Sequence, residues 1–179
     1  IGILDEAIQS LKDKYPQLVF IVAAGNENLN ACDSKEPVSF TGCDNCYMWP
    51  QSQLGKPYSY SDIPYVFVGA TDASKINGGD KRERASFSNF GKCVHVYTNG
   101  TPVCASPLFA SMMALYFNKF PNANATDATT YMIENAKKGT IKFGPGESDS
   151  NNTFAIITKD LETPGSGGET QGVMEIFQD

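Results

Sequence analysis

The hydrophobic and polar positions along the chain alternate between helical spacing and short apolar runs. Within residues 3–14, helical spacing relates four apolar residues, Leu4, Ala7, Ile8 and Leu11. This spacing predicts an amphipathic helix that Pro16 ends. Apolar runs at 18–26, 65–71 and 92–98 follow. Their length and continuity are typical of strands that are buried on both faces.

The second half of the chain carries two further helical segments. A helix predicted from Ser106 to about residue 118 is apolar on nearly every side, with Ser106 as its N-cap and Pro107 in its first turn. Another is predicted over about 127–138, and a long polar loop occupies 27–63. One helix, three strands and two helices in this order predict an α/β fold with a mainly parallel sheet.

Length and composition divide the chain into one folded domain and an extension. The sequence has 179 residues, of which 41% are hydrophobic and 19% charged, and these values predict a single globular domain over residues 1–160. Residues 161–179 include "ETPGSGGETQG" and are predicted to form a Gly-rich C-terminal extension. The first residue is Ile rather than Met, which we interpret as a processed end.

Charge and cysteine content point to a secreted protein. The net charge of −6, without a long Lys/Arg block, argues against a nucleic-acid partner. No apolar run is long enough to cross a bilayer. Sequons at Asn99, Asn124 and Asn151 predict a glycoprotein. Five cysteines are disulfide candidates, although a cytosolic protein with buried thiols is the alternative; they are Cys32, Cys43, Cys46, Cys93 and Cys104.

Other candidate motifs have plainer structural interpretations. Cys43 and Cys46 have the Cys-x-x-Cys spacing of zinc and redox sites, but one such pair without a second favours a disulfide. His95, the only histidine, is interpreted as a satisfied strand histidine. Lys81 and Arg82 form a dibasic pair that we assign to a solvated loop rather than to a processing site. We therefore predict no metal and no cofactor.

Four motifs occur in the order in which a known family has them. These are "VFIVAAGNEN", "YVFVGATD", "RASFSNFGKCVHVYTNG" and "ASPLFASMMAL". They resemble the C-terminal half of subtilisin-like serine proteases, and the secreted proteinase K branch is the most similar. The resemblance implies that residues 1–160 are the C-terminal half of a subtilase-like domain. It also implies a partial subtilisin-like fold, in which a mainly parallel sheet packs around a buried central helix.

The same resemblance implies that the catalytic serine is lost. Met-Ala-Ser-Pro of the family motif Gly-Thr-Ser-Met-Ala-Ser-Pro falls on residues 104–107, so the nucleophile position falls on Val103. The Asp and His motifs of the family do not occur, and only Asn26 matches an oxyanion-hole residue. We predict no catalytic residue and therefore a pseudoenzyme. Cys104 is predicted to lie in a disulfide; an active hydrolase that uses Cys104, or residues of a missing N-terminal chain, is the alternative.

Half of a subtilisin-like sheet would leave an apolar edge uncovered. The resemblance thus implies a second chain from the same precursor that carries the N-terminal half, giving a heterodimer, with a homodimer as the runner-up. The predicted function is binding by a secreted pseudoprotease, whose target would be a protein, a glycan or a membrane. Such a protein would suit one subunit of a two-chain toxin or effector. A purely structural role in an assembly is a further alternative.

Overall fold

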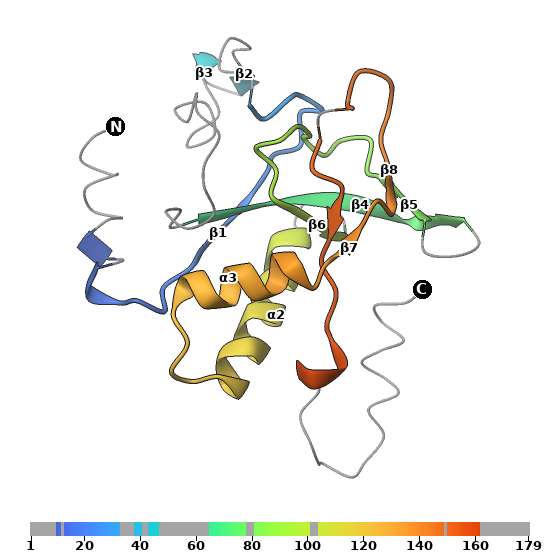
Figure 1. The fold of residues 1–179 in the computed structure, drawn as a ribbon. Coiled ribbons are helices and arrows are strands. Elements are labelled where there is room, and N and C mark those ends of the chain that lie inside the picture. Colours follow the sequence, from blue (N-terminus) through green and yellow to red (C-terminus); the bar gives the residue numbers. More distant parts are fainter. Residues whose placement is uncertain are drawn as a thin grey trace.

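The computed structural model describes residues 10–11, 13–32, 38–40, 43–46, 65–77, 81–100, 104–148 and 150–161. Within these residues a sheet runs across the molecule, and two helices lie together on one side of it (Figure 1). Helix α2 (Ala105–Lys119) packs against three strands of the sheet, and helix α3 (Ala125–Glu134) packs on α2. The predicted α/β class is confirmed.

Most of the sheet is parallel, as predicted. Strand β4 (Tyr65–Asn77) pairs in parallel with β1 (Phe20–Ala23) on one side and β6 (Val96–Asn99) on the other. β6 in turn pairs in parallel with β9 (Thr153–Phe154). Three short strands extend the sheet, namely β5 (Lys81–Arg84), β7 (Lys137–Lys138) and β8 (Ile141–Lys142).

Strand β4 is longer than the pattern predicts and changes partner along its length. Its first half lies between β1 and β6, where Gly69 leaves room for the ring of Tyr97. A Cβ on Gly69 would lie 2.4 Å from that ring, so only glycine fits there. From Thr71 onward β4 pairs in antiparallel fashion with β5. Strand β4 therefore pairs in parallel with some neighbours and in antiparallel fashion with another, within one sheet.

Strand β1 is less buried than predicted. The sequence predicts a strand that is covered on both faces, but Phe20, Ile21 and Val22 are half-buried and Ala23 is exposed. Among the described strands β1 pairs with β4 alone, beside the row that runs β7-β9-β6-β4-β5-β8. An edge strand has a neighbour on one side, which is why a wholly apolar segment is left half-covered here.

Helix α2 has one buried face and one exposed stripe. Its buried residues are Ala105, Phe109, Met112, Met113 and Tyr116. The exposed stripe consists of small or short side chains, namely Pro107, Ser111, Ala114 and Asn118. The described chain therefore does not cover this helix on every side. No helix of the described segments combines the length and apolarity needed to cross a membrane.

The start of α2 differs from the prediction. The helix begins at Ala105, and its N-cap position is occupied by Cys104 without a side-chain hydrogen bond. Ser106 lies inside the first turn, so its assignment as the N-cap is wrong. The Oγ of Ser106 is buried and has no hydrogen-bond partner among the described residues.

The C-terminal part is built from short elements. Helix α3 ends at Glu134, four residues before the predicted end, because Lys137–Lys138 pairs with β9 instead. The last described element is the 3-10 helix η2 (Lys159–Leu161), and Leu161 is 1% exposed. Leu161 therefore belongs to the core and not to the extension. Residues 162–179 lie outside the described residues, and the loop predicted at 27–63 contains β2 (Val38–Phe40) and β3 (Cys43–Cys46).

Candidate functional site

The carboxyl ends of β1 and β6 lie at one edge of the sheet, on either side of β4. Register places Ala23 of β1 beside Val68 and Asn99 of β6 beside Thr71. Because ligands of open parallel sheets bind outside the carboxyl ends of the strands, this edge is the natural candidate site. Both described residues that the sequence singles out for catalysis follow these strands, Asn26 after β1 and Cys104 after β6.

A buried asparagine holds the loop that carries Asn26. Asn89 is fully buried, and its Oδ1 accepts the N–H groups of Glu27 (3.1 Å) and Leu29 (2.9 Å). Its Nδ2 donates to the carbonyl oxygen of Ala24 (2.9 Å) and to Oε2 of Glu27 (2.9 Å). All four hydrogen-bonding positions of this amide are used. Asn26 itself is exposed, so the loop presents its side chain at the edge of the sheet.

A buried ion pair supports the same loop from the other side. The guanidinium of Arg84 donates from Nε to Oε2 of Glu147 (2.8 Å) and from Nη2 to Oε1, a bidentate contact. Nη2 also donates to Oδ1 of Asn28 (2.8 Å), and Nη1 donates to the carbonyl oxygens of Ala85 (2.9 Å) and Ser88. All five N–H groups of Arg84 are thereby used.

The carboxylate of Glu147 stays charged in this setting. Burial alone would raise the pKa of Glu147, but hydrogen bonds from Arg84 and from the backbone N–H of Gly144 outweigh burial and lower it. The side chains of Arg84 and Glu147 are only 7% and 10% exposed. This pair therefore links β5 and the loop after β1 to the segment before β9.

On the other side of β4, close contacts join the end of β6 to the start of α2. The hydroxyl of Thr98 donates to the carbonyl oxygen of Ala105 (2.9 Å), and that of Thr71 donates to Oδ1 of Asn99 (2.9 Å). Gly100 lies so close to the helix that a Cβ on it would be 3.1 Å from the Cβ of Cys104. Val103, the predicted position of the lost nucleophile, lies outside the described residues.

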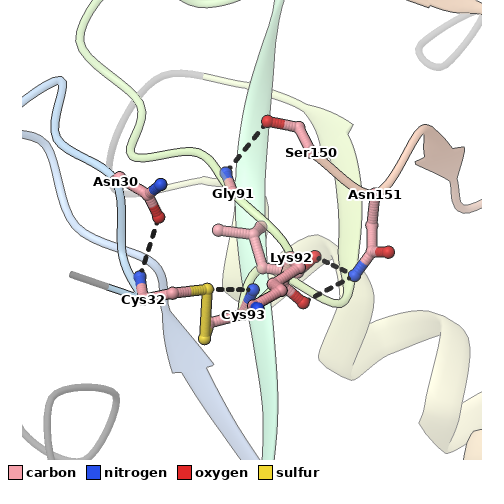
Figure 2. Close-up of a disulfide and its surroundings, with 8 residues drawn as sticks. Asn30, Cys32, Gly91, Lys92, Cys93, Ser150 and Asn151 are labelled. Atoms are coloured by element: carbon pink, nitrogen blue, oxygen red, sulfur yellow. Dashed lines mark hydrogen bonds between the residues drawn. A yellow bond between two sulfur atoms is a disulfide. The ribbon is translucent and has the colours of Figure 1, made fainter. Parts of the chain in front are cut away.

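The cysteines differ in their bonding and exposure. A disulfide joins Cys32 to Cys93 and links the segment after β1 to the turn before β6, which confirms the disulfide prediction for these two residues (Figure 2). Cys104 is exposed, and no disulfide joins it to another cysteine among the described side chains, so its disulfide stays a prediction. The side chains of Cys43 and Cys46 lie outside the described part, and their disulfide stays a prediction.

His95 immediately precedes β6, at the end of that strand remote from Cys104. Hydrogen bonds to strand β4 hold it in place. Its side chain is 6% exposed, and its Nδ1 accepts the N–H of Phe67 (3.1 Å), while its backbone N–H donates to the carbonyl oxygen of Phe67 (3.0 Å). Burial lowers the pKa of His95 from 6.5 to about 4. The imidazole is therefore neutral at pH 7, as the interpretation of a satisfied strand histidine requires.

This buried histidine makes stability depend on pH. The unfolded chain binds a proton at His95 near pH 6.5 and the folded chain near pH 4, so the unfolded state binds more protons between these values. Stability is then full above pH 6.5 and falls as the pH decreases towards 4. We expect the free energy of unfolding in urea to be about 2 kcal/mol lower at pH 5 than at pH 7.5.

The matched variant is His95→Asn, whose side chain can accept the same N–H without titrating. Because His95 is the only histidine of the chain, this substitution should remove most of the difference between pH 7.5 and pH 5. An equally large difference in the variant would show that another group causes it.

The dibasic pair Lys81 and Arg82 begins β5 instead of lying in a solvated loop, so that interpretation is wrong. Arg82 is 8% exposed because its guanidinium stacks on the ring of Phe154 (4.0 Å), and its backbone N–H bonds to Thr140. Among the described side chains, no three His, Cys, Asp or Glu come together as a possible metal site.

The three sequon asparagines occupy different positions. Asn99 ends β6 and is half-buried, Asn124 is the exposed N-cap of α3, and Asn151 is half-buried beside the disulfide. Sequence reasoning missed Asn89, Arg84 and Glu147, which shape the candidate edge. The motif "RASFSNFGKCVHVYTNG" contains Arg84 and Asn89, but nothing in the sequence pointed to Glu147.

The edge thus offers an exposed amide at Asn26 and an exposed thiol at Cys104, flanking the central strand. Such groups can bind a polar ligand, but acyl transfer also requires a base in contact with the nucleophile. His95 and Asn99 are four residues apart along the chain, or about 13 Å in an extended strand. The imidazole is thus out of reach of the thiol, which lies beyond Asn99.

No protein-family model matches the chain. Among solved structures, a cold adapted subtilisin-like serine proteinase has a TM-score of 0.59 and 20% identity, over 88% of this chain and 51% of that chain. A chain in the structure of the subtilase cytotoxin SubAB assembly has a TM-score of 0.63 and 17% identity, over 89% of this chain and 52% of that chain. This chain thus spans about half the length of either structure. What it shares with both is part of a subtilisin-like fold.

Proposed function

We propose that this chain is a catalytically inactive subtilase-like protein, of the proteinase K branch, that acts by binding. The observation that carries this proposal is the position of its only histidine. His95 is buried, has Nδ1 engaged by the N–H of Phe67, and lies at the end of β6 remote from Cys104. A serine or cysteine nucleophile needs a base within hydrogen-bond reach, and this imidazole cannot serve as one.

The sequence provides a second argument for inactivity, because the nucleophile of the family is missing. Val103 stands where the family motif has its serine, so Asn26 would have no oxyanion to stabilise. In subtilisin itself, removal of the nucleophilic serine lowers kcat by about a millionfold. The scaffold would then be retained for its surface, with the edge between Asn26 and Cys104 as the place where a ligand of polar character binds.

We further propose that a second chain carrying the N-terminal half of the fold completes the sheet as a heterodimer. Three observations support it. β1 is an apolar strand that pairs with β4 alone among the described strands, and it is only half-buried. α2 presents a stripe of short side chains to solvent, against which another backbone could pack closely. The match covers only about half of either solved structure.

A secreted, glycosylated toxin or effector subunit is the biological setting that we propose. The Cys32–Cys93 disulfide is typical of proteins from oxidising compartments. Fold similarity to a chain of the subtilase cytotoxin SubAB assembly supports the toxin assignment. The target would be a protein, a glycan or a membrane. The extension at 161–179, from which we exclude Leu161, would be a linker outside the domain.

Chemical labelling tests the loss of activity. The native protein, with any chain that copurifies, is treated with a fluorophosphonate and, separately, with iodoacetamide in the presence and absence of peptide substrates. We expect no fluorophosphonate label and no peptide hydrolysis, and we expect Cys104 to be alkylated equally with and without peptide because its thiol is exposed. Val103→Ser should not restore hydrolysis, since it supplies no base.

The opposite result would support the alternative hydrolase. Peptide hydrolysis that Cys104→Ala abolishes, together with protection of Cys104 by the peptide, would place a base from another chain beside this thiol. Cys104→Ala is a suitable control because the exposed side chain contributes little to stability.

Mass spectrometry tests the partner. Intact masses under native, denaturing and reducing conditions should show a second polypeptide of different sequence. A native mass of twice this chain would favour the homodimer, with pairing along β1. A monomer that unfolds cooperatively by itself would contradict both assemblies.

A further inference from the structure

The three sequons are equivalent in sequence, but their side-chain amides are not equivalent in the fold. An N-linked glycan is attached at Nδ2, while Oδ1 is left unchanged. Which of the two atoms the folded protein uses therefore decides whether a modified side chain can keep its native contacts. Asn124 and Asn151 use opposite atoms.

Asn124 uses its oxygen. Oδ1 accepts the N–H of Asp127 (2.9 Å), and the carboxylate of Asp127 accepts the N–H of Asn124 (3.0 Å), which forms a capping box at the start of α3. Asn124 is exposed. A sugar on Nδ2 would leave both bonds of the capping box intact.

The surroundings of Asn124 are open as well. Ala123 and Asp127 line a shallow groove at the end of α2, together with Tyr116, Lys119, Phe120, Pro121 and Asn122. Phe120 is 37% exposed. Because Asn124 is exposed between two residues that line this groove, Ala123 and Asp127, a first sugar residue on it would extend into solvent.

Asn151 uses its nitrogen. Nδ2 donates both of its hydrogens, to the carbonyl oxygens of Lys92 (2.8 Å) and Val94 (3.0 Å), and Figure 2 shows the amide pointing into this turn beside the disulfide. The neighbouring Ser150 accepts the N–H of Gly91 (3.0 Å). A sugar on Nδ2 would replace one of the two hydrogens and would need the space of the turn.

Asn99 is also tied into the fold. It is half-buried at the end of β6, and its Oδ1 accepts the hydroxyl of Thr71 (2.9 Å). A glycan on Asn99 would have to project from the sheet at the junction with α2. At this junction Gly100 already packs closely on Cys104.

We propose that Asn124 is the glycan acceptor of this chain, and that Asn151 is a structural clamp which the folded protein keeps unmodified. In the transfer, Nδ2 of Asn124 forms a bond to C1 of a lipid-linked oligosaccharide diphosphate. The bond from C1 to the diphosphate oxygen breaks, the lipid diphosphate leaves, and the amide gives up one proton. The inference rests on the secretory setting proposed above and is independent of the loss of catalysis.

Site mapping in a secretory host tests the proposal, because such a host supplies the pathway whatever the natural location of the chain. The secreted full chain is treated with a glycan-releasing amidase in ¹⁸O-water, which marks each formerly glycosylated asparagine as ¹⁸O-aspartate. We expect the label in the peptide of Asn124 and not in that of Asn151. Label on Asn151 at the level of Asn124, or none on Asn124, would overturn the proposal.

Two substitutions control for position and for structure. Thr126→Ala removes the sequon but keeps Asn124, so the glycan mass should disappear while the unfolding temperature of the deglycosylated protein is unchanged. In unglycosylated protein, Asn151→Asp should lower the unfolding temperature, because a carboxylate would face two carbonyl oxygens. Asn124→Asp should not, since it keeps the acceptor of the cap. Equal unfolding temperatures for the two Asp variants would contradict the clamp.

Discussion

Arg84→Met will lower the free energy of unfolding by about 3–5 kcal/mol, the largest effect that we expect from a single substitution. The variant keeps the length of the side chain but leaves the carboxylate of Glu147 buried without its partner. It also leaves the oxygens of Asn28, Ala85 and Ser88 without this donor. Urea denaturation at pH 7 measures the change.

Two control variants distinguish the effect of breaking the buried ion pair from the effect of removing any charged side chain. Lys142→Ala removes a bond from Lys142, 75% exposed, to Glu83 (3.1 Å), and we expect a change below about 1 kcal/mol. The double variant Arg84→Met, Glu147→Leu should recover part of the loss, because no uncompensated charge stays buried. A single variant as stable as Lys142→Ala would contradict the role of this pair.

Replacing both Cys32 and Cys93 by alanine will cost about 4 kcal/mol in the chain-entropy model. The reason is the separation of 61 residues between the two cysteines, since an unfolded chain without this link gains the freedom of a long loop. The measurement is denaturation of the wild type and the double variant, each with and without a reductant.

The reductant supplies an internal control. It should destabilise the wild type to the level of the double variant and leave the double variant unchanged. Cys104→Ser should behave as the wild type in all conditions, because this exposed thiol is not part of the disulfide. Wild-type stability that does not respond to complete reduction would show that the link contributes nothing.

Periodicity predicts the elements that bury apolar residues over several turns or several strand positions. The start of α2 is predicted within two residues, and the first half of β4 begins where its apolar run begins. The short strands β5 and β7 escape prediction because "KRER" and "KK" are charged and too brief to show a period. They exist because neighbouring segments supply backbone partners, which no local pattern records.

The candidate site was predictable only in part, for a related reason. Motif resemblance locates Asn26 and Val103, since these positions are defined by the residues beside them in the chain. The groups that shape the edge are joined over long separations, 63 residues for Arg84 and Glu147. A single sequence holds no signal that pairs two such residues. The exposure of β1 likewise depends on which strands stand beside it.

The fully buried amide of Asn89 also sets an order of events during folding. It binds the N–H groups of Glu27 and Leu29, which precede it by 62 and 60 residues. The ribosome therefore delivers this loop long before the side chain that holds it. The loop therefore stays without its native partner until residues 84–90 have been synthesised and have docked on the sheet.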